Sequence, residues 1–276
     1  DRIEMAAPEA GHLLVKPSWA PDEAMTVKLV STFHGNPRLG LPVVQGLITL
    51  FDAATGTPVA MMDGGSITAA RTAGASALSA KLLAQSDSRV LAIVGAGAQG
   101  RAHLDALLRV RPFDEVRIAS LLADEARSLA AADRRCRLCD SCRDAVRGAD
   151  VVCLCTNSGT PVIEAGWIEA GAHVISVGYR PPGGELPVEL ARAGKLVVET
   201  RRAFDPPPVG CGELAGLDPA LGVELGELVL GRAAGRSSNG EITVFKSMGH
   251  AMEDLVAAGL VYRRAIKEDA GIVVEL

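Results

Sequence analysis

Apolar and polar residues alternate along the opening third of the chain with the two-residue period of a β-strand. The alternation is clear over residues 25–33, which have the sequence MTVKLVSTF. Two further strand-like segments, residues 43–51 and 59–63, are separated by DAATGTP, whose glycine and proline favour a turn. The opening third is therefore predicted to be rich in strands, with a hairpin over residues 43–63.

A helical period replaces this alternation at residue 66. Ser66 follows two glycines and belongs to the residue types that cap helix N-termini well. In the segment 66–85 small and apolar residues recur at helical spacing. They are Ile67, Ala70, Gly74, Ala77, Leu78 and Leu82. We expect a helix whose small residues allow close packing, with Ser66 as its N-cap and the sequence SDS after its end.

From Val90 onward, short apolar segments alternate with helical ones. Strands are predicted over residues 90–94, 115–119, 136–139, 150–155, 172–177 and 195–199. Helices are predicted over residues 99–110, 124–132, 141–148, 165–168 and, at the end, about 247–267, and a further segment, VELARAG, covers residues 188–194. Strands that alternate with helices are typical of an α/β fold with a Rossmann-type, doubly wound parallel sheet. We expect this unit over residues 87–236, after an α+β unit that the final helix joins.

The sequence LAIVGAGAQGRAH, at residues 91–103, places three glycines between the first of these strands and a helix. In a dinucleotide-binding loop, Gly95 would allow the tight turn and Gly97 the approach of a pyrophosphate. Gly100 would allow close contact between helix and strand. The free N–H groups at the start of the helix, where Ala98 and Gln99 lie, favour an anion. The loop therefore predicts dinucleotide binding; the alternative is a tight structural turn without a cofactor.

The next strand leaves the choice between NAD and NADP open. An acidic residue about 20 positions after the glycines would bind the ribose hydroxyls of NAD. Ser120 occupies that position, followed by two leucines, and no arginine is present there for the 2′-phosphate of NADP. Asp124 is nearby, but we expect it to begin the next helix.

Composition excludes several classes of protein. Hydrophobic residues make up 48% and charged residues 22% of the 276 residues, enough for a sizeable core. Aromatic residues are only 3% and the net charge is −5, which argues against a nucleic-acid surface. No apolar segment approaches the length of a membrane helix, and the N-terminus lacks the pattern of a signal peptide. We expect a cytoplasmic protein that binds neither nucleic acid nor membrane.

Five of the six cysteines lie between Cys136 and Cys155. Cys136, Cys139 and Cys142 have the spacing of a zinc or iron–sulfur site. The sequence offers no second C-x-x-C and no histidine near them, so a closed set of four ligands is lacking. The VVCLC segment suits a buried parallel strand, in which cysteine behaves as a small hydrophobic residue. We therefore expect core cysteines and no metal. The five histidines and Cys211 are expected to be structural as well.

Three cationic side chains are candidates for substrate binding and proton exchange. Lys28 lies within the apolar sequence VKLV, where it either faces solvent or is buried beside a site with a lowered pKa. Arg71 lies in the alanine-rich helix, either on a solvated face or at the site. Arg180 follows a parallel strand, at the edge of an open sheet where ligands bind.

The same segments resemble the ornithine cyclodeaminase/mu-crystallin family in order and across nearly the whole chain. The most specific matches are the RTA sequence of the alanine-rich helix and the block FKSMGHAMED near the end. The resemblance implies an NAD(P)-dependent enzyme of small α-amino or α-imino acids. It also implies that residues 1–84 with 247–276 bind substrate and form a homodimer, and that residues 87–236 bind the dinucleotide.

The resemblance further implies roles for individual residues. Arg2, Lys28 and Arg71 match the family's carboxylate-binding cations, with Lys28 also at the reacting centre and Arg71 also toward the cofactor. Gln99 and the loop glycines match the pyrophosphate site. Thr156, Val177 and Ser247 match the nicotinamide pocket. Three cations around one carboxylate would orient the α-carbon for hydride transfer.

The sequence departs from the cyclodeaminases at one position. These enzymes carry an aspartate after the VG strand to handle the substrate amine, and Arg180 occupies the matching position here. An arginine does not accept a proton at neutral pH. This favours a ketimine or imine reductase or an amino acid dehydrogenase over an ornithine cyclodeaminase. A crystallin-like cofactor-binding protein without activity is a third possibility. Family members also have a helical segment before the first arginine, whereas the sequence begins at Asp1.

Overall fold

The computed structural model of the chain describes residues 3–7, 11–33, 35–207 and 209–275. The chain folds into two compact units, and the division falls inside helix α1 (Gly64–Leu83). The first unit comprises Asp1–Arg71 with His250–Leu276, and the second comprises Thr72–Gly249. The last helix therefore belongs with the N-terminal strands, although the whole second unit separates them in the sequence.

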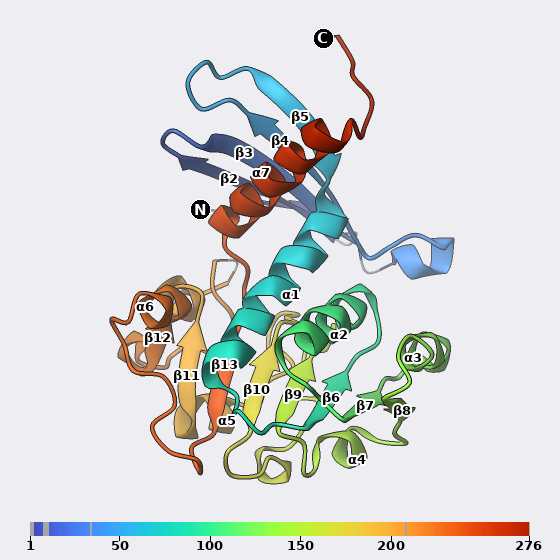
Figure 1. Cartoon of the computed structure of the whole chain (residues 1–276), viewed down its shortest axis with the longest axis vertical. Helices are drawn as coiled ribbons and strands as arrows, with labels where there is room; N and C mark the ends of the chain where they lie inside the picture. Colours follow the sequence, from blue (N-terminus) through green and yellow to red (C-terminus); the bar gives the residue numbers. More distant parts are fainter. Residues whose placement is uncertain (1–2, 8–10, 34, 208, 276) are drawn as a thin grey trace. The chain divides into compact units, whose positions relative to one another are not determined.

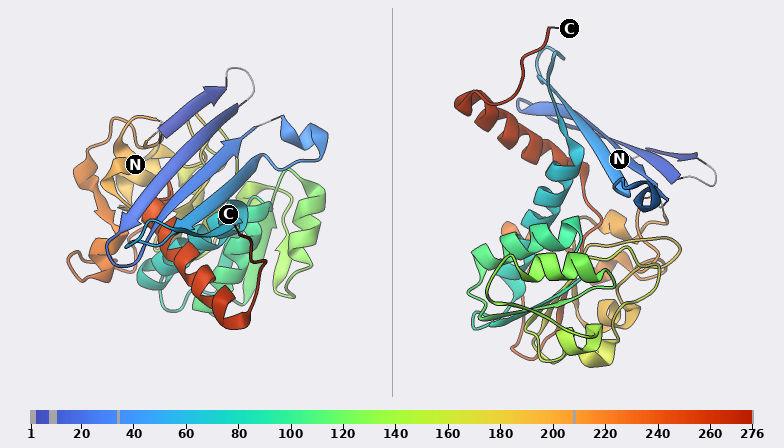
Figure 2. Two further views of the ribbon diagram at one scale, coloured as in Figure 1. Left: turned by 90° about the horizontal axis from the view of Figure 1, so that it is seen from above. Right: turned by 90° about the vertical axis from the view of Figure 1, so that its right-hand side faces the viewer.

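The first unit is built on one antiparallel sheet whose five strands follow chain order. The strands are β1 (Ile3–Ala7), β2 (Gly11–Ala20), β3 (Ala24–Thr32), β4 (Val44–Phe51) and β5 (Pro58–Asp63), with a short 3-10 helix η1 (Asn36–Leu39) before β4. Helix α7 (Ala251–Glu268) packs along β2, β3 and β4 (Figures 1 and 2). The predicted hairpin is confirmed, because β4 and β5 pair antiparallel.

The two-residue period of the strands decides which side chains face α7. Ile48 and Leu50 of β4 are buried in a cluster with Leu255 of α7. Lys28 of β3 lies directly opposite Ile48 in the register of the sheet, so both side chains share the face that α7 covers. The same pattern that builds this small core therefore also buries a lysine.

The start of α1 differs from the prediction. The helix begins at Gly64, and the carboxylate of Asp63 accepts hydrogen bonds from Gly65 N at 2.8 Å and Ser66 Oγ at 2.6 Å. Ser66 lies inside the first turn and is not the N-cap. Asp63 is a cap residue of the same chemical kind, but it closes the preceding strand, where the sequence pattern indicated only β-structure.

The second unit is built on an eight-stranded parallel sheet with the order β12-β11-β13-β10-β9-β6-β7-β8. These strands are β6 (Val90–Val94), β7 (Glu115–Ala119), β8 (Cys136–Leu138), β9 (Val151–Leu154), β10 (His173–Ser176), β11 (Lys195–Val198), β12 (Gly222–Glu224) and β13 (Thr243–Lys246). The order reverses at β6, which pairs with β7 on one side and β9 on the other. This is the doubly wound arrangement, and the predicted α/β fold is confirmed.

The helices of the second unit match the prediction in part. They are α2 (Ala98–Val110), α3 (Ala123–Ala130), α4 (Cys142–Val146), α5 (Val188–Ala193) and α6 (Leu225–Val229), with 3-10 turns η2 (Ala165–Trp167), η3 (Arg201–Phe204) and η4 (Pro219–Leu221). The helix predicted over 165–168 is only the single turn η2. The final helix begins at Ala251 rather than near Ser247, because His250 caps it and accepts from Met252 N.

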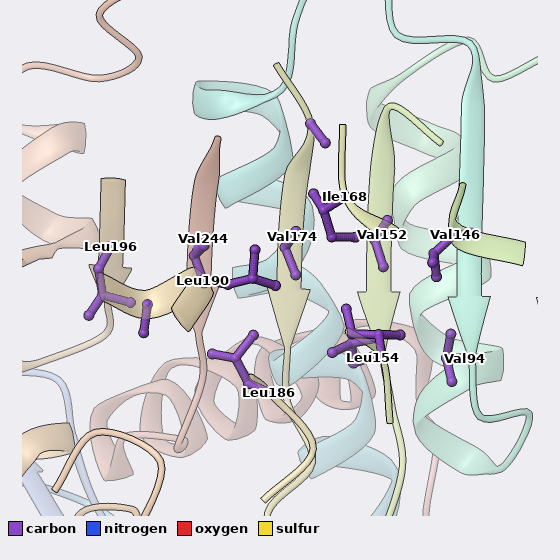
Figure 3. Packing of buried hydrophobic residues seen from close by; sticks show 14 of the residues in the cluster. Val94, Val146, Val152, Leu154, Ile168, Val174, Leu186, Leu190, Leu196 and Val244 are labelled. Atoms are coloured by element: carbon purple, nitrogen blue, oxygen red, sulfur yellow. The ribbon is translucent and has the colours of Figure 1, made fainter. Parts of the chain in front are cut away.

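Two hydrophobic clusters cover the two faces of the parallel sheet. On one face, strand residues pack with α1, α2, α3 and α6. On the other face, Val152, Val174 and Val244 of neighbouring strands pack with Leu190 of α5 (Figure 3). Continuous burial on both faces explains why β9 has the unbroken apolar sequence VVCL rather than an alternating one.

Among the described residues, no helix has both the length and the apolar character needed to cross a bilayer.

Candidate active site

Lys28 is buried beside a carboxylate from the far end of the chain. The residue is 1% exposed, and its Nζ donates to Asp254 Oδ1 at 2.7 Å and to Thr68 Oγ1 at 3.1 Å. Asp254 lies in the first turn of α7, on the face that packs against β3. Of the two alternatives for Lys28, the structure therefore shows the buried one.

Two further cations and a second acid complete this cluster within the first unit. Arg71 Nε donates to Asp254 Oδ1 at 3.0 Å, and its Nη1 donates to Glu253 Oε2 at 2.9 Å. Lys16 lies directly opposite Lys28 in the sheet, with its Nζ 3.8 Å from Asp254 Oδ2. We call Lys16, Lys28, Arg71, Glu253 and Asp254 the cationic cluster. Its three cations exceed its two carboxylates by one formal charge.

Burial and neighbouring charges shift the proton affinities in this cluster. Burial, followed by the charge of Arg71, lowers the pKa of Lys28 to about 7, although Asp254 acts in the opposite direction. Burial alone would raise the pKa of Asp254, but the charges of Arg71, Lys28 and Lys16 outweigh it and hold that pKa below its usual value. Asp254 is therefore ionised, while Lys28 can gain and lose a proton near neutral pH.

The glycine loop of the second unit fits a dinucleotide. A methyl group on Gly95, where φ is +99°, would lie 2.5 Å from the carbonyl oxygen of Cys155. A methyl group on Gly100 would lie 2.2 Å from the carbonyl oxygen of Gly95. A methyl group on Gly97 would meet only Glu125 Oε2, at 3.5 Å. The fold thus requires the first and third glycines, whereas the second leaves room for a ligand.

The start of α2 offers backbone donors at the same place. Gly97 is the N-cap of α2, and no side chain accepts a hydrogen bond from the helix N-terminus. Ala98 is exposed and Gln99 is half-buried, with its Oε1 buried and without a hydrogen bond to any described residue. Uncapped N–H groups at a helix start attract a phosphate.

A buried carboxylate that the sequence analysis missed fixes the strand ends beside this loop. Glu185 Oε2 accepts from both the N and the Oγ1 of Thr156, at 2.6 and 2.7 Å. Its Oε1 accepts from Val177 N at 3.0 Å and from Gly178 N at 2.6 Å. Thr156 and Val177, both expected in the nicotinamide pocket, are thereby brought together at the carboxyl ends of β9 and β10, the ligand-binding edge of such a sheet.

Two more acids, the buried Glu213 and the half-buried Glu199, organise the same edge. Lys246 Nζ lies 2.6 Å from Glu213 Oε2 and donates to Gly178 O at 2.7 Å. Ser247, another residue expected in the pocket, donates through Oγ to Glu199 Oε1 at 2.5 Å. These contacts join segments 30 to 70 residues apart, so no local sequence pattern indicates them.

The remaining candidates lie as follows. Ser120 Oγ accepts from Leu122 N at 3.2 Å, just after β7. Arg180 is exposed in the segment between β10 and α5, and no hydrogen bond or ion pair joins it to another described side chain. Arg2 falls outside the described residues.

The cysteines lie in two different surroundings. Cys139 and Cys142 are half-buried against one core cluster, and Cys136 is half-buried against the other. Cys153 and Cys155 lie deeper, with their sulfur atoms 3.5 Å apart and next to His103 of α2. His103 Nδ1 donates to Gln99 O at 2.8 Å, and burial raises the pKa of the Cys155 thiol well above its usual value. His103 is 50 residues from Cys153 in the sequence, and α2 brings it to these two cysteines only in the folded chain.

Comparison with known proteins shows the family of the chain. The family model described as ornithine cyclodeaminase/mu-crystallin matches residues 2–269. The chain belongs to the ornithine cyclodeaminase/mu-crystallin family. Its resemblance to that family, seen first in sequence motifs, is thereby confirmed.

Similar members of the ornithine cyclodeaminase/mu-crystallin family are named as reductases. The ketimine reductase mu-crystallin of Mus musculus is 39% identical over 259 residues, which cover 93% of this chain and 81% of that protein. A Delta(1)-pyrroline-2-carboxylate reductase of Bacillus cereus is 32% identical over 283 residues, covering 98% and 86%. The structure of the Thermococcus litoralis Delta(1)-pyrroline-2-carboxylate reductase, in complex with NADH and L-proline, superposes with a TM-score of 0.92 at 34% identity, covering 99% of this chain and 88% of that one.

Proposed function

We propose that this member of the family is an NAD(P)-dependent oxidoreductase that reduces the C=N bond of a small α-imino acid to the α-amino acid. The observation that carries the proposal is the buried Lys28, whose pKa of about 7 suits proton exchange at neutral pH. Reduction of an imine needs a hydride at carbon and a proton at nitrogen, and Lys28 supplies the proton. The reductase names of the similar proteins support this direction.

The cationic cluster binds the substrate carboxylate in this proposal. Arg71 and Lys28, together with Arg2, hold the carboxylate and so fix the α-carbon in position. Asp254 stays ionised, holds the ammonium of Lys28 through its hydrogen bond, and offsets part of the positive charge. The proton then moves from Lys28 Nζ to the substrate nitrogen, and water restores it.

The second unit binds the cofactor in this proposal. NADH or NADPH, when bound, supplies the hydride to the α-carbon. The loop Gly95–Gly100 with Ala98 and Gln99 holds the pyrophosphate, and Ser120 lies toward the adenosine ribose. Thr156, Val177 and Ser247, held by Glu185 and Glu199, line the nicotinamide pocket. In domain terms, residues 87–236 bind the dinucleotide, and residues 1–84 with 247–276 bind the substrate.

Arg180 supports reduction over cyclodeamination. Cyclodeamination needs a group that accepts a proton from the substrate amine, and a guanidinium does not do so at neutral pH. An exposed arginine offers instead a cation to a substrate that carries a second anionic group.

A panel of cyclic ketimines, linear α-imino acids and amino acids tests the proposal, with NADH and NADPH supplied separately and absorbance followed at 340 nm. We expect reduction of at least one α-imino acid and no release of ammonia from L-ornithine. Ammonia release without net oxidation of the cofactor would show a cyclodeaminase instead. Cofactor binding without turnover on any member of the panel would show a crystallin-like binding protein.

We also propose that the first unit forms a homodimer through the sheet face opposite α7. Trp19, Leu29, Leu47 and Met61 are large apolar side chains that are exposed on that face. Large exposed apolar side chains that share one face of a sheet suit an interface between copies. Light scattering should give about twice the monomer mass, and Leu47→Glu should shift it toward the monomer. Leu230→Glu, at an exposed leucine of the second unit, should not.

The six free cysteines suit a reducing compartment, and we propose that the protein acts in the cytoplasm.

A further inference from the structure

In many Rossmann folds, an acidic residue at the end of the strand after the glycine-loop helix binds the ribose of the cofactor. This chain has no acid at that position. β7 ends at Ala119 and is followed by Ser120, Leu121 and Leu122. The hydroxyl of Ser120 already accepts a hydrogen bond from Leu122 N, and the side chain of Leu121 is fully exposed. If a carboxylate binds the ribose hydroxyls here, it must come from another element.

Glu125 is such a carboxylate. It lies in the first turn of α3, is half-buried, and its Oε2 is 3.5 Å from the position of a methyl group on Gly97. Gly97 is the loop position at which the fold leaves room for a ligand, so the carboxylate faces that space. Among the described residues, no hydrogen bond or ion pair engages Glu125.

Helix stability alone does not account for this arrangement. Two acids in the first turn of α3 favour the helix dipole, and either would serve that purpose from a solvated position. Asp124 does so, because it is exposed and its carboxylate pairs with Arg127. Glu125 instead turns toward the glycine loop. The pairing of Asp124 also engages Arg127, which is the first Lys or Arg after β7.

We propose that Glu125 binds the adenosine ribose diol of the cofactor and makes this protein select NAD(H) over NADP(H). This inference rests on the proposed function, because it assigns which dinucleotide the loop holds. A carboxylate accepts hydrogen bonds from the 2′- and 3′-hydroxyls of NAD(H). The same carboxylate repels the 2′-phosphate of NADP(H), and residues 120–126 contain no cation to balance that charge.

Binding measurements on the whole chain without substrate test the inference. The Kd values of NADH and NADPH are measured by nucleotide fluorescence for the wild type, Glu125→Gln and the matched control Asp124→Asn. We expect the wild type to bind NADH at least about tenfold more tightly than NADPH. Glu125→Gln should weaken NADH binding by about tenfold and bring the two constants together. Asp124→Asn should leave the ratio unchanged.

The possible outcomes separate this inference from the proposed function. Equal binding of both nucleotides by the wild type, or NADH binding that Glu125→Gln does not change, would overturn the role of Glu125 alone, and reduction of an imino acid with either nucleotide would then still stand. Failure of the wild type to bind either nucleotide would overturn both. A gain of NADPH binding in the double variant Leu121→Arg/Glu125→Gln would support the inference independently, because it replaces the repelling charge by an attracting one.

Discussion

The ammonium group of Lys28 lies 2.7 Å from the carboxylate of Asp254, and both side chains are almost completely buried. Lys28 lies in β3 and Asp254 in α7, so the ion pair joins the N-terminal sheet of the first unit to the last helix of the chain. A buried ion pair of this kind stabilises little by itself, because desolvation opposes the attraction. In the proposed reaction, the ion pair holds in position a lysine whose proton is exchangeable at neutral pH.

The pH dependence of the reaction follows from the lowered pKa of Lys28. Imine reduction needs the protonated ammonium, which is the dominant form below pH 7, so kcat/KM for reduction should fall as pH rises through about 7. Oxidation of the amino acid needs the neutral amine and should rise over the same range. Initial rates in both directions between pH 5.5 and about 9 would measure this. Two profiles that move in the same direction would contradict a proton-transfer role for Lys28.

Asp254→Asn should destabilise the first unit and change the profile. The buried cations Lys28 and Arg71 would lose their shared carboxylate, which costs about 3 kcal/mol of unfolding free energy. The fall of the reduction rate with rising pH should move to lower pH, since Asp254 raises the pKa of Lys28. Denaturant unfolding and the pH profile measure the two effects. Asp105→Asn, which breaks an exposed pair with Arg109, is the control and should leave both unchanged.

Glu185→Gln should weaken cofactor binding while leaving the substrate cluster intact. Both carboxylate oxygens of Glu185 accept from several donors, so an amide would place its NH2 group against the N–H of Thr156 or of Val177. We expect a several-fold higher Kd for NADH and a lower melting temperature. Glu189→Gln, an exposed glutamate of α5, should change neither. Unaltered NADH binding in Glu185→Gln would show that cofactor binding does not depend on the hydrogen bonds that Glu185 accepts from the strand ends.

Two of the loop glycines, Gly95 and Gly97, should respond differently to alanine. Gly95→Ala should prevent correct folding, because the added methyl group would overlap the backbone of Cys155 at a left-handed φ. Gly97→Ala should fold normally and bind NADH at least about tenfold more weakly. Gly74→Ala in α1, where no atom lies within 4 Å of the added methyl group, is the control for helix propensity. Tight NADH binding by Gly97→Ala would argue that the loop is a structural turn.

The elements of the parallel sheet could be predicted because their signals are local. The strands at 90–94 and 115–119 match β6 and β7 residue for residue. The first is an unbroken apolar segment that ends at Gly95, and the second has the sequence EVRIA and ends at Ser120. The alternation did not reveal β12 and β13, which are strands of only three and four residues. The prediction that Ser66 is the N-cap of α1 was wrong, because the carboxylate of Asp63, at the end of β5, accepts the hydrogen bonds of the first turn, including one from Ser66 Oγ.

The partners of the site residues could not be predicted from local pattern. Lys28 was identified, but Asp254 lies 226 positions away in the sequence. Lys16 lies in a strand that the alternation did not reveal, and Glu185 lies in a loop rich in glycine and proline. An available signal was the adjacent acid pair Glu253 and Asp254 at the start of an amphipathic helix. Adjacent positions point about 100° apart on a helix, so such a pair can place one acid toward the core, and a buried acid requires a buried cation.

The replacement Lys28→Met tests the central claim most directly, measured as the steady-state rate of imino acid reduction beside the Kd of NADH. Methionine is an unbranched side chain only one atom shorter than lysine, and Lys81→Met, at an exposed lysine of α1, is the matched control. We predict that Lys28→Met lowers kcat/KM by roughly 10²- to 10⁴-fold, with the Kd of NADH unchanged. Reduction by Lys28→Met at a rate close to that of the wild type would contradict the assignment of Lys28 as the proton donor.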